Sequence, residues 1–596
     1  MNHDILRHLN KKQQESVINY SGPSVILAGA GSGKTRVLVA KVIYLIKEKK
    51  VNSASIVMMT FTNKAAAEMK ERINRQLEGL VKLGYVGTYH SFCVRVLRIF
   101  WEPARLDKNF IIYDDDDQKS LVKQIIQEKK LLGKKTPGYF LYYISLAKNQ
   151  MITPEKFMEN FKFHQAALVA DVYYHYQKKL EINHGVDFDD LLIKTAYLLQ
   201  KNDDVLSYYH NKYKYFLVDE FQDTNYVQYL LTKLLAEKSK NITVVGDFSQ
   251  SIYSWRGADI TNLKKFETDF KGTKTFYLEE NYRSSQKILD FAFSVISKNS
   301  THPILHLFTD NKSGEDVVFH QADNEQAEAV YAAEEITRLN NGSSVVAPPT
   351  FAILYRTNAQ SRVLEEVFLH YGIPYILVGG TRFYERKEIK DVLAYLKLLI
   401  NPNESVSLER IKKLGKNRFT KFKKLYEEMK EKLETVSTDE IIEKLFQNVD
   451  YLKLYDVEDE EDFSRLENIK ELKSVALSFP KLMDFLEQVA LVESEYSQHE
   501  KKMKENDSRL VLMTLHQAKG LEFDHVFIVG VEEGLLPHSR SIDDQFQLEE
   551  ERRLFYVGIT RAKKTLYITN TRKRFIFGQQ GYSTPSRFIS DEPTAY

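Results

Sequence analysis

The stretch Ala28-Gly29-Ala30-Gly31-Ser32-Gly33-Lys34-Thr35 follows the apolar run Ser24 to Leu27 and precedes a helix-forming run. Glycines let backbone N–H groups curl around phosphate oxygens, and a lysine at the helix start supplies positive charge. We therefore predict a triphosphate-binding loop, with Lys34 on the β and γ phosphates and the Thr35 hydroxyl on Mg²⁺. The alternative is an ordinary glycine-rich turn. Ala28 stands where the strict pattern has glycine, and its small side chain keeps the loop possible.

Length and composition set the class of protein. The chain has 596 residues, 43% of them hydrophobic, which suffices for about four domains with real cores. Its one cysteine, Cys93, excludes internal disulfides and cysteine-cluster metal sites, and is expected to be a buried apolar residue. We find no leader sequence and no apolar run near the ~20 residues of a membrane span, so a cytoplasmic location is expected. The net charge of +2 means that any nucleic-acid site must be a local patch.

Short apolar runs alternate with helical patterns along the chain. The runs are Val25 to Leu27, Ser55 to Met59, Phe216 to Val218 and Thr243 to Val245, followed by Phe351 to Tyr355, His525 to Val529 and Thr565 to Ile568. They predict two α/β units with buried parallel strands and ligands at the carboxyl ends of those strands. Helix-rich insertions without an active-site motif are expected near residues 100–195 and 385–505.

Two charged stretches lie in these insertions. The acidic run Asp114 to Asp117 is expected to cap a helix, the alternative being a metal site. The stretch from Lys421 to Glu434 is expected to be a solvated helix face. Neither stretch indicates a catalytic function.

A second chemical signal is the apolar strand that ends in Asp219-Glu220. A carboxylate at a strand end can hold Mg²⁺, and its neighbour can orient or deprotonate an attacking water. We assign Asp219 to the metal and Glu220 to the water; a solvent-facing acidic pair is the alternative. Hydrolysis also needs positive charge near the γ phosphate, for which Arg283 and Arg561 are candidates. Without further context, a surface or salt-bridge role is the better interpretation of each arginine.

The ordered set of motifs resembles a superfamily 1 DNA helicase of the UvrD/Rep/PcrA type, over nearly the whole chain. The motifs are LNKKQ at 9–13, AGAGSGKT at 28–35, TFTNKAAAEMKERI at 60–73, GTYHSFC at 87–93, DFDDLL at 187–192, VDEFQDTN at 218–225, VGDFSQSIYSWRGA at 245–258, LEENYRSS at 278–285, GGTRFYERKEIKD at 379–391, TLHQAKGLEF at 514–523 and EERRLFYVGITRA at 550–562.

The resemblance implies an α/β fold with two RecA-like parallel-sheet motor domains, each carrying a mainly α-helical insertion. The first motor domain is expected at 1–98 and 196–278 with its insertion at 99–195. The second is expected at 279–384 and 506–596, with a shortened insertion at 385–505.

The resemblance also implies roles for single residues. Gln13 would read adenine, Tyr282 would stack on it, and Glu522 would approach the ribose. Gln250 would sense the γ phosphate, and Arg283 and Arg561 would reach it from the second motor domain. The ATP-binding set is Gln13, Ala28, Gly29, Ala30, Gly31, Ser32, Gly33, Lys34, Thr35, Arg36, Tyr282, Arg283, Glu522 and Arg561. The catalytic set is Lys34, Asp219, Glu220, Gln250, Arg283 and Arg561, with Mg²⁺ on Thr35 and Asp219.

A different class of residues is implied for DNA. Aromatic side chains can stack on successive bases without reading sequence. The implied DNA-binding set is Phe61, Asn63, Thr88, His90, Tyr253, Trp255, Arg256, Arg356, Asn358 and His516. For Phe61 and Tyr253 the alternative is a place in the core.

By resemblance, the chain is a bacterial-type, nucleoid-associated enzyme of DNA repair or replication, acting as a monomer or weak dimer. It would move 3′ to 5′ on single-stranded DNA and unwind duplex at single/double-strand junctions. Two departures from the family pattern matter. Phe248-Ser249 replaces an acidic pair beside Gln250, and Lys416 to Thr420 replaces a turn that grips duplex. The altered turn makes a translocase that strips proteins but unwinds weakly an alternative. A silent DNA-binding subunit is a third hypothesis, and the presence of all six residues of the catalytic set argues against it.

Overall fold

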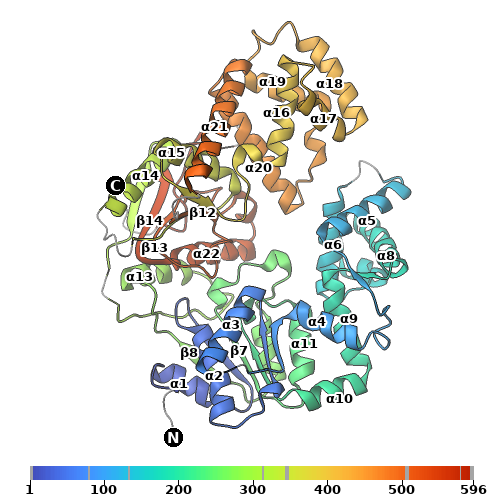
Figure 1. The fold of residues 1–596 in the computed structure, drawn as a ribbon, viewed down its shortest axis with the longest axis vertical. Coiled ribbons are helices and arrows are strands. Elements are labelled where there is room, and N and C mark those ends of the chain that lie inside the picture. Colours follow the sequence, from blue (N-terminus) through green and yellow to red (C-terminus); the bar gives the residue numbers. More distant parts are fainter. Residues whose placement is uncertain are drawn as a thin grey trace. The chain divides into compact units, whose positions relative to one another are not determined.

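The computed structural model describes residues 5–77, 79, 81–131, 135–311, 314–341, 348–503, 509–576 and 579–590. The chain forms two compact units. One comprises Met1–Arg283 and Ile296–Asn311, and the other comprises Ser284–Val295 and Lys312–Tyr596. Each unit combines a parallel sheet with a group of helices inserted into it (Figure 1).

The first sheet has six parallel strands in the order β3-β2-β6-β7-β1-β8. The strands are β1 (Ser24–Ala28), β2 (Ile56–Thr60), β3 (Tyr85–Thr88), β6 (Tyr215–Val218), β7 (Ile242–Gly246) and β8 (Lys274–Leu278). Apolar clusters cover both faces, formed with α1 (Lys11–Ile18), α2 (Lys34–Lys47), α3 (Asn63–Gln76), α4 (Tyr89–Ile99), α11 (Tyr226–Ala236) and α12 (Asn262–Asp269). The carboxyl ends of β6, β7 and β1 are therefore neighbours along the carboxyl edge of this sheet, where its parallel strands end.

The first insertion has a hydrophobic core of its own, which contains Leu121, Phe140 and Tyr176. Its elements are β4 (Ile111–Ile112), α5 (Asp115–Glu128), α6 (Pro137–Asn149), α7 (Phe157–Asn160), α8 (Ala166–Ile182) and β5 (Gly185–Val186). The helices α9 (Phe188–Lys201) and α10 (Asp203–Lys212) follow, and the predicted boundary at residue 195 lies inside α9. Leu191 and Leu198 of α9 pack in the core of the first sheet, so this helix belongs to that core.

The second sheet also has six parallel strands, in the order β11-β12-β10-β13-β14-β9. They are β9 (Val318–Ala322), β10 (Phe351–Tyr355), β11 (Tyr375–Leu377), β12 (Leu510–Thr514), β13 (Phe523–Ile528) and β14 (Ala562–Thr571). Its helices are α13 (Gln286–Ile296), α14 (Glu325–Asn341), α15 (Ser361–His370) and α22 (Gln545–Ile559), and a hairpin of β15 (Lys573–Ile576) and β16 (Gln579–Tyr582) follows β14. The two sheets confirm the predicted α/β fold class.

The second insertion consists of helices around a separate core. They are α16 (Lys387–Ile400), α17 (Ser405–Lys413), α18 (Lys416–Met429), α19 (Thr438–Val449), α20 (Glu460–Leu477) and α21 (Leu482–Met503). The first residues of this core are Phe383 and Tyr384, in a short 3-10 helix over Phe383–Glu385. The predicted start at residue 385 lies at the end of that short helix.

Two smaller predictions are confirmed. Asp114 caps α5 and forms a capping box with Asp117, which explains the acidic run. Cys93 is buried in the first core. Among the residues that the structure describes, no helix is long and apolar enough to cross a membrane.

Candidate nucleotide and DNA sites

The glycine-rich loop joins β1 to α2 in the predicted position. Gly31 and Gly33 have φ of 67° and 83°, which residues other than glycine rarely adopt. The helix α2 begins at Lys34, directly after Gly33. The Ser32 hydroxyl donates to the Gly29 carbonyl over 2.8 Å and closes the loop. The first N–H groups of α2 thus face the space above the strand end, as phosphate binding requires.

The segment that follows β8 packs against this loop. The Asn281 amide donates to the Ala30 carbonyl over 2.6 Å, and the Tyr282 N–H donates to the Gly31 carbonyl over 3.0 Å. A Cβ at Gly31 would lie 2.6 Å from the Asn281 amide nitrogen, so only glycine fits there. These contacts place Tyr282 and Arg283 beside the phosphate loop. Arg283 lies in the first compact unit rather than in the second, where the sequence led us to expect it.

Gln13 is buried against the same loop. Its Nε2 donates to the Ser32 carbonyl over 2.9 Å, while its Oε1 accepts the N–H of Asn10 in the capping box of α1. Asn10 in turn donates to the Tyr282 hydroxyl over 2.8 Å. The structure therefore brings together Gln13, Tyr282 and the loop, but both ends of the Gln13 amide are engaged, one with the loop and the other with the start of α1. Its contact with adenine stays a prediction.

The carboxylates lie at the neighbouring strand ends. Asp219 follows β6 and Asp247 follows β7, and burial raises the pKa of Asp219 to about 7, with a further contribution from Glu220. Burial also raises the pKa of Asp247, and the charge of Lys34 offsets part of both shifts. Within the described part of the chain, Oδ1 of Asp219 is buried and makes no hydrogen bond. A buried carboxylate oxygen without a donor suits a cation, and Mg²⁺ takes few protein ligands beside phosphates, so Thr35 and Asp219 fit Mg²⁺.

Glu220 has an unusual backbone. Its φ of 50° and ψ of 44° are left-handed, a conformation that glutamate rarely adopts. Gln222 holds its side chain by donating from Nε2 to Oε2 over 2.6 Å. The same Gln222 accepts the N–H of Asp247 over 3.0 Å, and Gln250 donates to Asp247 over 2.6 Å. Gln222 and Asp247 thus join Glu220, which the sequence assigned to the attacking water, to Gln250, which the resemblance assigned to the γ phosphate.

An aromatic group lies in the first unit. The rings of Phe61 and Tyr253 are stacked with centroids 5.4 Å apart, and Trp255 lies edge-on to Tyr253. Arg256 lies over the Trp255 ring at 4.5 Å, and Trp255 is 44% exposed. Phe61 follows β2 and Tyr253 follows β7, so their stacking joins two motifs that are far apart in the sequence. The exposed ring is suited to stacking on a base.

A second set of predicted DNA residues lies at helix starts in the first unit. Asn63 begins α3, Thr88 caps α4, and His90 lies in the first turn of α4. His90 is edge-on to Phe188, a ring that is 45% exposed. The sequence analysis did not assign Phe188 to DNA. The only signal for it in the sequence was an aromatic residue inside the motif DFDDLL at 187–192.

The second unit holds the remaining predicted residues. Arg356 forms a bidentate ion pair with the buried Glu551, and the charge of His516 also acts on Glu551. Asn358 lies two residues after Arg356, following β10. Arg561 is 1% exposed and donates to the carbonyls of Val557 and Leu521, and Glu522 pairs with Lys563 over 2.7 Å. Contact of Arg561 with a nucleotide stays a prediction.

The comparisons with known proteins agree with this geometry. The UvrD/REP helicase N-terminal domain matches residues 9–271, and the UvrD-like helicase C-terminal domain matches residues 276–421 and 412–573. The chain belongs to the UvrD-like helicase family. One UvrD-like relative, the ATP-dependent DNA helicase PcrA of Bacillus subtilis, is 41% identical over 100% of this chain and 87% of its own length. The ATP-dependent DNA helicases PcrA of Staphylococcus aureus and Staphylococcus epidermidis are each 40% identical, over 99% of this chain and 87% of their own length.

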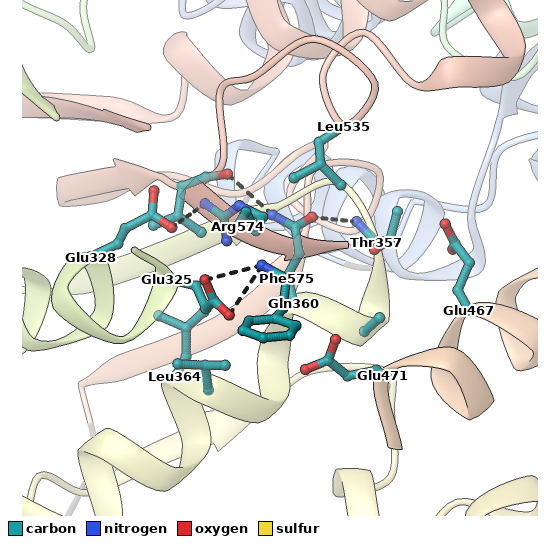
Figure 2. A pocket seen from close by; sticks show the side chains of 13 residues that line it. Glu325, Glu328, Thr357, Gln360, Leu364, Glu467, Glu471, Leu535, Arg574 and Phe575 are labelled. Atoms are coloured by element: carbon teal, nitrogen blue, oxygen red, sulfur yellow. Dashed lines mark hydrogen bonds and ion pairs between the residues drawn. The ribbon is translucent and has the colours of Figure 1, made fainter. Parts of the chain in front are cut away.

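A cavity in the second RecA-like domain of this UvrD-like chain is a separate feature (Figure 2). It lies between the second sheet and α20, and Glu325, Glu328, Glu467 and Glu471 line it. Three of these carboxylates have a basic partner: Arg574 pairs with Glu328, His538 with Glu467, and Arg362 with Glu471. Glu325 accepts the N–H of Phe575. None of the described residues in its lining was predicted for ATP or DNA.

Proposed function

We propose that this protein is an ATP-dependent DNA helicase that moves 3′ to 5′ on single-stranded DNA and separates duplex at a junction. One observation carries the proposal: the phosphate loop, Asp219 and Glu220 meet at one sheet edge, in a unit that also exposes a stacked aromatic group. The names of the 40–41% identical relatives support ATP-dependent DNA helicase activity, and the direction of movement rests on the family resemblance. The proposed setting is DNA repair or replication in the bacterial cytoplasm, at the nucleoid, as a monomer or weak dimer.

Each residue of the site has a definite task in hydrolysis. The N–H groups after Gly29 and the ammonium of Lys34 bind the phosphates. Thr35 and Asp219 would hold Mg²⁺, which neutralises charge on the β and γ phosphates. Glu220 orients the attacking water and accepts its proton, and Gln222 fixes the carboxylate for that task.

The remaining residues supply specificity and charge. Tyr282 offers a partly exposed ring for the adenine beside Gln13, and Glu522 approaches the ribose. Arg283 and Arg561 stabilise the charge that develops on the γ phosphate, Arg561 coming from the second unit. Closure of the two units on ATP and reopening after hydrolysis would then move the strand.

DNA is held by residues of both units in this proposal. Phe61, Tyr253 and Trp255 stack on bases, and Arg256 adds positive charge beside Trp255. The other members of the proposed DNA-binding set are Asn63, Thr88 and His90 in the first unit and Arg356, Asn358 and His516 in the second. Stacking without base-edge contacts predicts binding with little sequence preference.

A second candidate is a translocase that displaces proteins and unwinds weakly. The observation that favours it is the junction of α17 and α18, where Gly415 has a φ of 120° and Lys416 begins α18. Arg418, the arginine of this junction, donates to the carbonyls of Leu414 and Asp450 inside the insertion. Two of its three guanidinium nitrogens are thus engaged within the protein, which reduces the capacity of this turn to grip duplex.

The deciding experiment compares 3′-tailed, 5′-tailed and blunt duplexes, each as DNA and as RNA, with the purified protein and ATP. A 3′–5′ DNA helicase separates the 3′-tailed DNA alone. Removal of streptavidin from biotinylated single strands, measured in parallel, identifies the translocase if it is fast while duplex separation is slow. ATP-independent binding without either activity would contradict both candidates.

A further inference from the structure

The last turn of α6, in the first insertion, lies against the turn formed by Ser254–Arg256 and Gly257. This turn carries Trp255 and is called the Trp255 loop. The residues involved on α6 are Ser145, Lys148 and Asn149. None of them belongs to the nucleotide or DNA sets described above. The last turn of α6 is held from one side by α9 and touches the Trp255 loop on the other.

Buried charge fixes the last turn of α6 to α9. The Lys148 ammonium is 1% exposed and lies 2.6 Å from Asp187 and 2.8 Å from Asp190. Asp187 and Asp190 also form the capping box at the start of α9, and the Tyr176 hydroxyl donates to Asp187 over 2.9 Å. A buried charge with two opposite partners and a further donor resists displacement, because moving it leaves a charge unpaired. The turn is therefore a rigid base.

Asn149 extends from this base. Its Nδ2 donates to the Ser145 carbonyl over 2.9 Å and lies 3.4 Å from Asp189 Oδ1, and its Oδ1 accepts from the Nδ2 of Asn225. A Cβ at Gly257 would lie 3.3 Å from both Cβ and Cγ of Asn149. Gly257 has a φ of 82° and ends the turn that contains Trp255 and Arg256. Asn149 thus lies directly on the backbone of the Trp255 loop.

Asn225 connects the same loop to the carboxylates. It follows Asp219-Glu220 by a few residues, caps α11, and forms a bridge to Ala258. The Asp259 N–H donates to the Thr224 carbonyl over 3.0 Å, and the Asn262 amide donates to the same carbonyl over 2.9 Å. Asn149 therefore contacts both partners, the segment that follows Glu220 and the loop that presents Trp255.

We propose that Asn149 is a positioning residue for the Trp255 loop, through which the first insertion sets how strongly single-stranded DNA stimulates ATP hydrolysis. The proposal rests on the proposed function for its kinetic consequence. Its structural basis, the contacts of Asn149 with Gly257 and Asn225, is independent of the proposed function. Asn149 acts through the loop and touches neither nucleotide nor DNA.

The first test is Asn149→Ala in the full-length protein, with Asn160→Ala as the matched control. Asn160 ends α7 in the same insertion and makes the same amide bond to the carbonyl four residues earlier, over 2.9 Å, but at an exposed site. We expect Asn149→Ala to raise the oligo(dT) concentration for half-maximal ATPase stimulation about tenfold, the size that one buried hydrogen bond allows. The DNA-independent rate and the KM for ATP should stay within about twofold. Equal behaviour of the two variants would overturn the proposal.

A second variant isolates the bond to Asn225. Asn225→Asp keeps the acceptor that caps α11 but replaces the Nδ2 donor by an oxygen that faces Asn149 Oδ1. We expect the same rise in half-maximal DNA concentration as for Asn149→Ala. The double variant should show no further rise, because both changes break one interaction. Additive effects in the double variant would overturn the coupling.

A third measurement needs no DNA. Trp101 and Trp255 are the two tryptophans, so Trp101→Phe makes Trp255 the sole reporter. In that background, acrylamide should quench Trp255 more strongly in Asn149→Ala than in Asn160→Ala, with equal melting temperatures. Unchanged quenching contradicts the positioning role. Increased quenching in a protein whose ATPase ignores DNA would uphold the positioning role and refute the proposed function.

Discussion

The two sheets share one architecture but differ in how the carboxylates at their carboxyl edges are compensated. In the first sheet, burial raises the pKa of Asp219 to about 7 and that of Asp247 above its ordinary value. In the second sheet, burial alone would raise the pKa of Glu551 and Glu532, but forked ion pairs with Arg356 and Arg574 lower both. In the ranges that the structure describes, these two carboxylates at the first edge lack a neutralising arginine partner that would lower their pKa values, whereas the two at the second edge are neutralised by arginines of the same unit.

This difference separates a ligand site from a structural one. A buried carboxylate with a raised pKa is stabilised when a cation arrives, so the first edge gains most from Mg²⁺ and nucleotide. A buried carboxylate that already has an arginine gains nothing from a further cation. Fold alone would give equal roles to both edges, whereas the pairing of charges supports the proposal that the first edge is the ATP site.

The largest expected effect comes from the first edge. Lys34→Ala and Glu220→Gln should lower DNA-stimulated ATP hydrolysis by about 10²- to 10⁴-fold, because one removes the phosphate charge and the other the proton acceptor. Phosphate release assays with saturating oligo(dT) measure this. DNA binding, followed by fluorescence anisotropy, should survive in both.

The control for that experiment is Glu71→Gln, an exposed carboxylate of α3 that pairs with Arg75. Its turnover should match the unmodified protein. Full turnover in Glu220→Gln would show that this residue is not catalytic. It would also contradict the conclusion that the first edge is a ligand site and the second a structural one.

The next effect is on stability, at the second edge. Arg574→Met leaves Glu328 and Glu532 buried without their shared cation, which should lower the free energy of unfolding by about 3–5 kcal/mol. Urea unfolding followed by circular dichroism measures this loss. Nucleotide affinity of the folded protein should not change.

Arg587→Met is the matched control, since Arg587 forms the same forked pair with Glu533 at a partly exposed site. Its effect on the unfolding free energy should stay below about 1 kcal/mol. Equal losses in the two variants would show that burial does not set the strength of these pairs.

A smaller effect concerns DNA. Trp255→Ala removes an exposed stacking surface, so single-strand affinity should fall by about 1–3 kcal/mol while the DNA-independent ATPase is retained. Trp101→Phe provides the control for loss of a tryptophan elsewhere. Normal unwinding and normal affinity in Trp255→Ala would exclude this ring from the DNA site.

The smallest effect is a pH dependence at Asp219. With a pKa near 7 the free carboxyl is largely protonated at pH 6, and binding of a magnesium nucleotide requires its ionised form. Affinity should therefore fall up to about tenfold per pH unit below 7, and binding at pH 6 should release a proton. Calorimetry in two buffers of different ionisation enthalpy measures this release, which should vanish in Asp219→Asn.

The same shift has a consequence for the free protein. Because the folded pKa of Asp219 lies above its ordinary value of 3.8, the folded state keeps a proton that the unfolded state has lost between about pH 4 and 7. The unfolding free energy contributed by Asp219 should thus decrease as pH rises through that window. A rise instead, removed by Asp219→Asn, would contradict the assignment.

The sequence predicted the inner strands better than the outer ones. The predicted runs correspond to β1, β2, β6, β7, β10, β13 and β14, all of them inner strands. The edge strands β3, β8, β9 and β11, and the inner strand β12, were not predicted individually. An inner strand of a parallel sheet is covered on both faces and reads as a continuous apolar run, whereas all residues of β8 and β9 except the last are partly or fully exposed.

The site could be predicted where a motif names the residue, and not where a contact depends on tertiary structure. The phosphate loop and the carboxylates lie where the motifs placed them. No local pattern indicated that Asn281 would lie on the loop, that both ends of the Gln13 amide would be engaged, or that Arg561 would be buried. Each of these facts depends on which segment packs beside the residue, and that information is spread over distant parts of the chain.

At position 220, protein stability and ATP turnover favour different residues, because Glu220 has a left-handed backbone conformation. Asparagine and glycine adopt this conformation more readily than glutamate does, so either would relieve strain on the order of 1 kcal/mol. Neither carries a carboxylate that could accept a proton from water. A library selected for thermal stability would therefore move this position away from glutamate, and a library selected for ATP turnover would restore it.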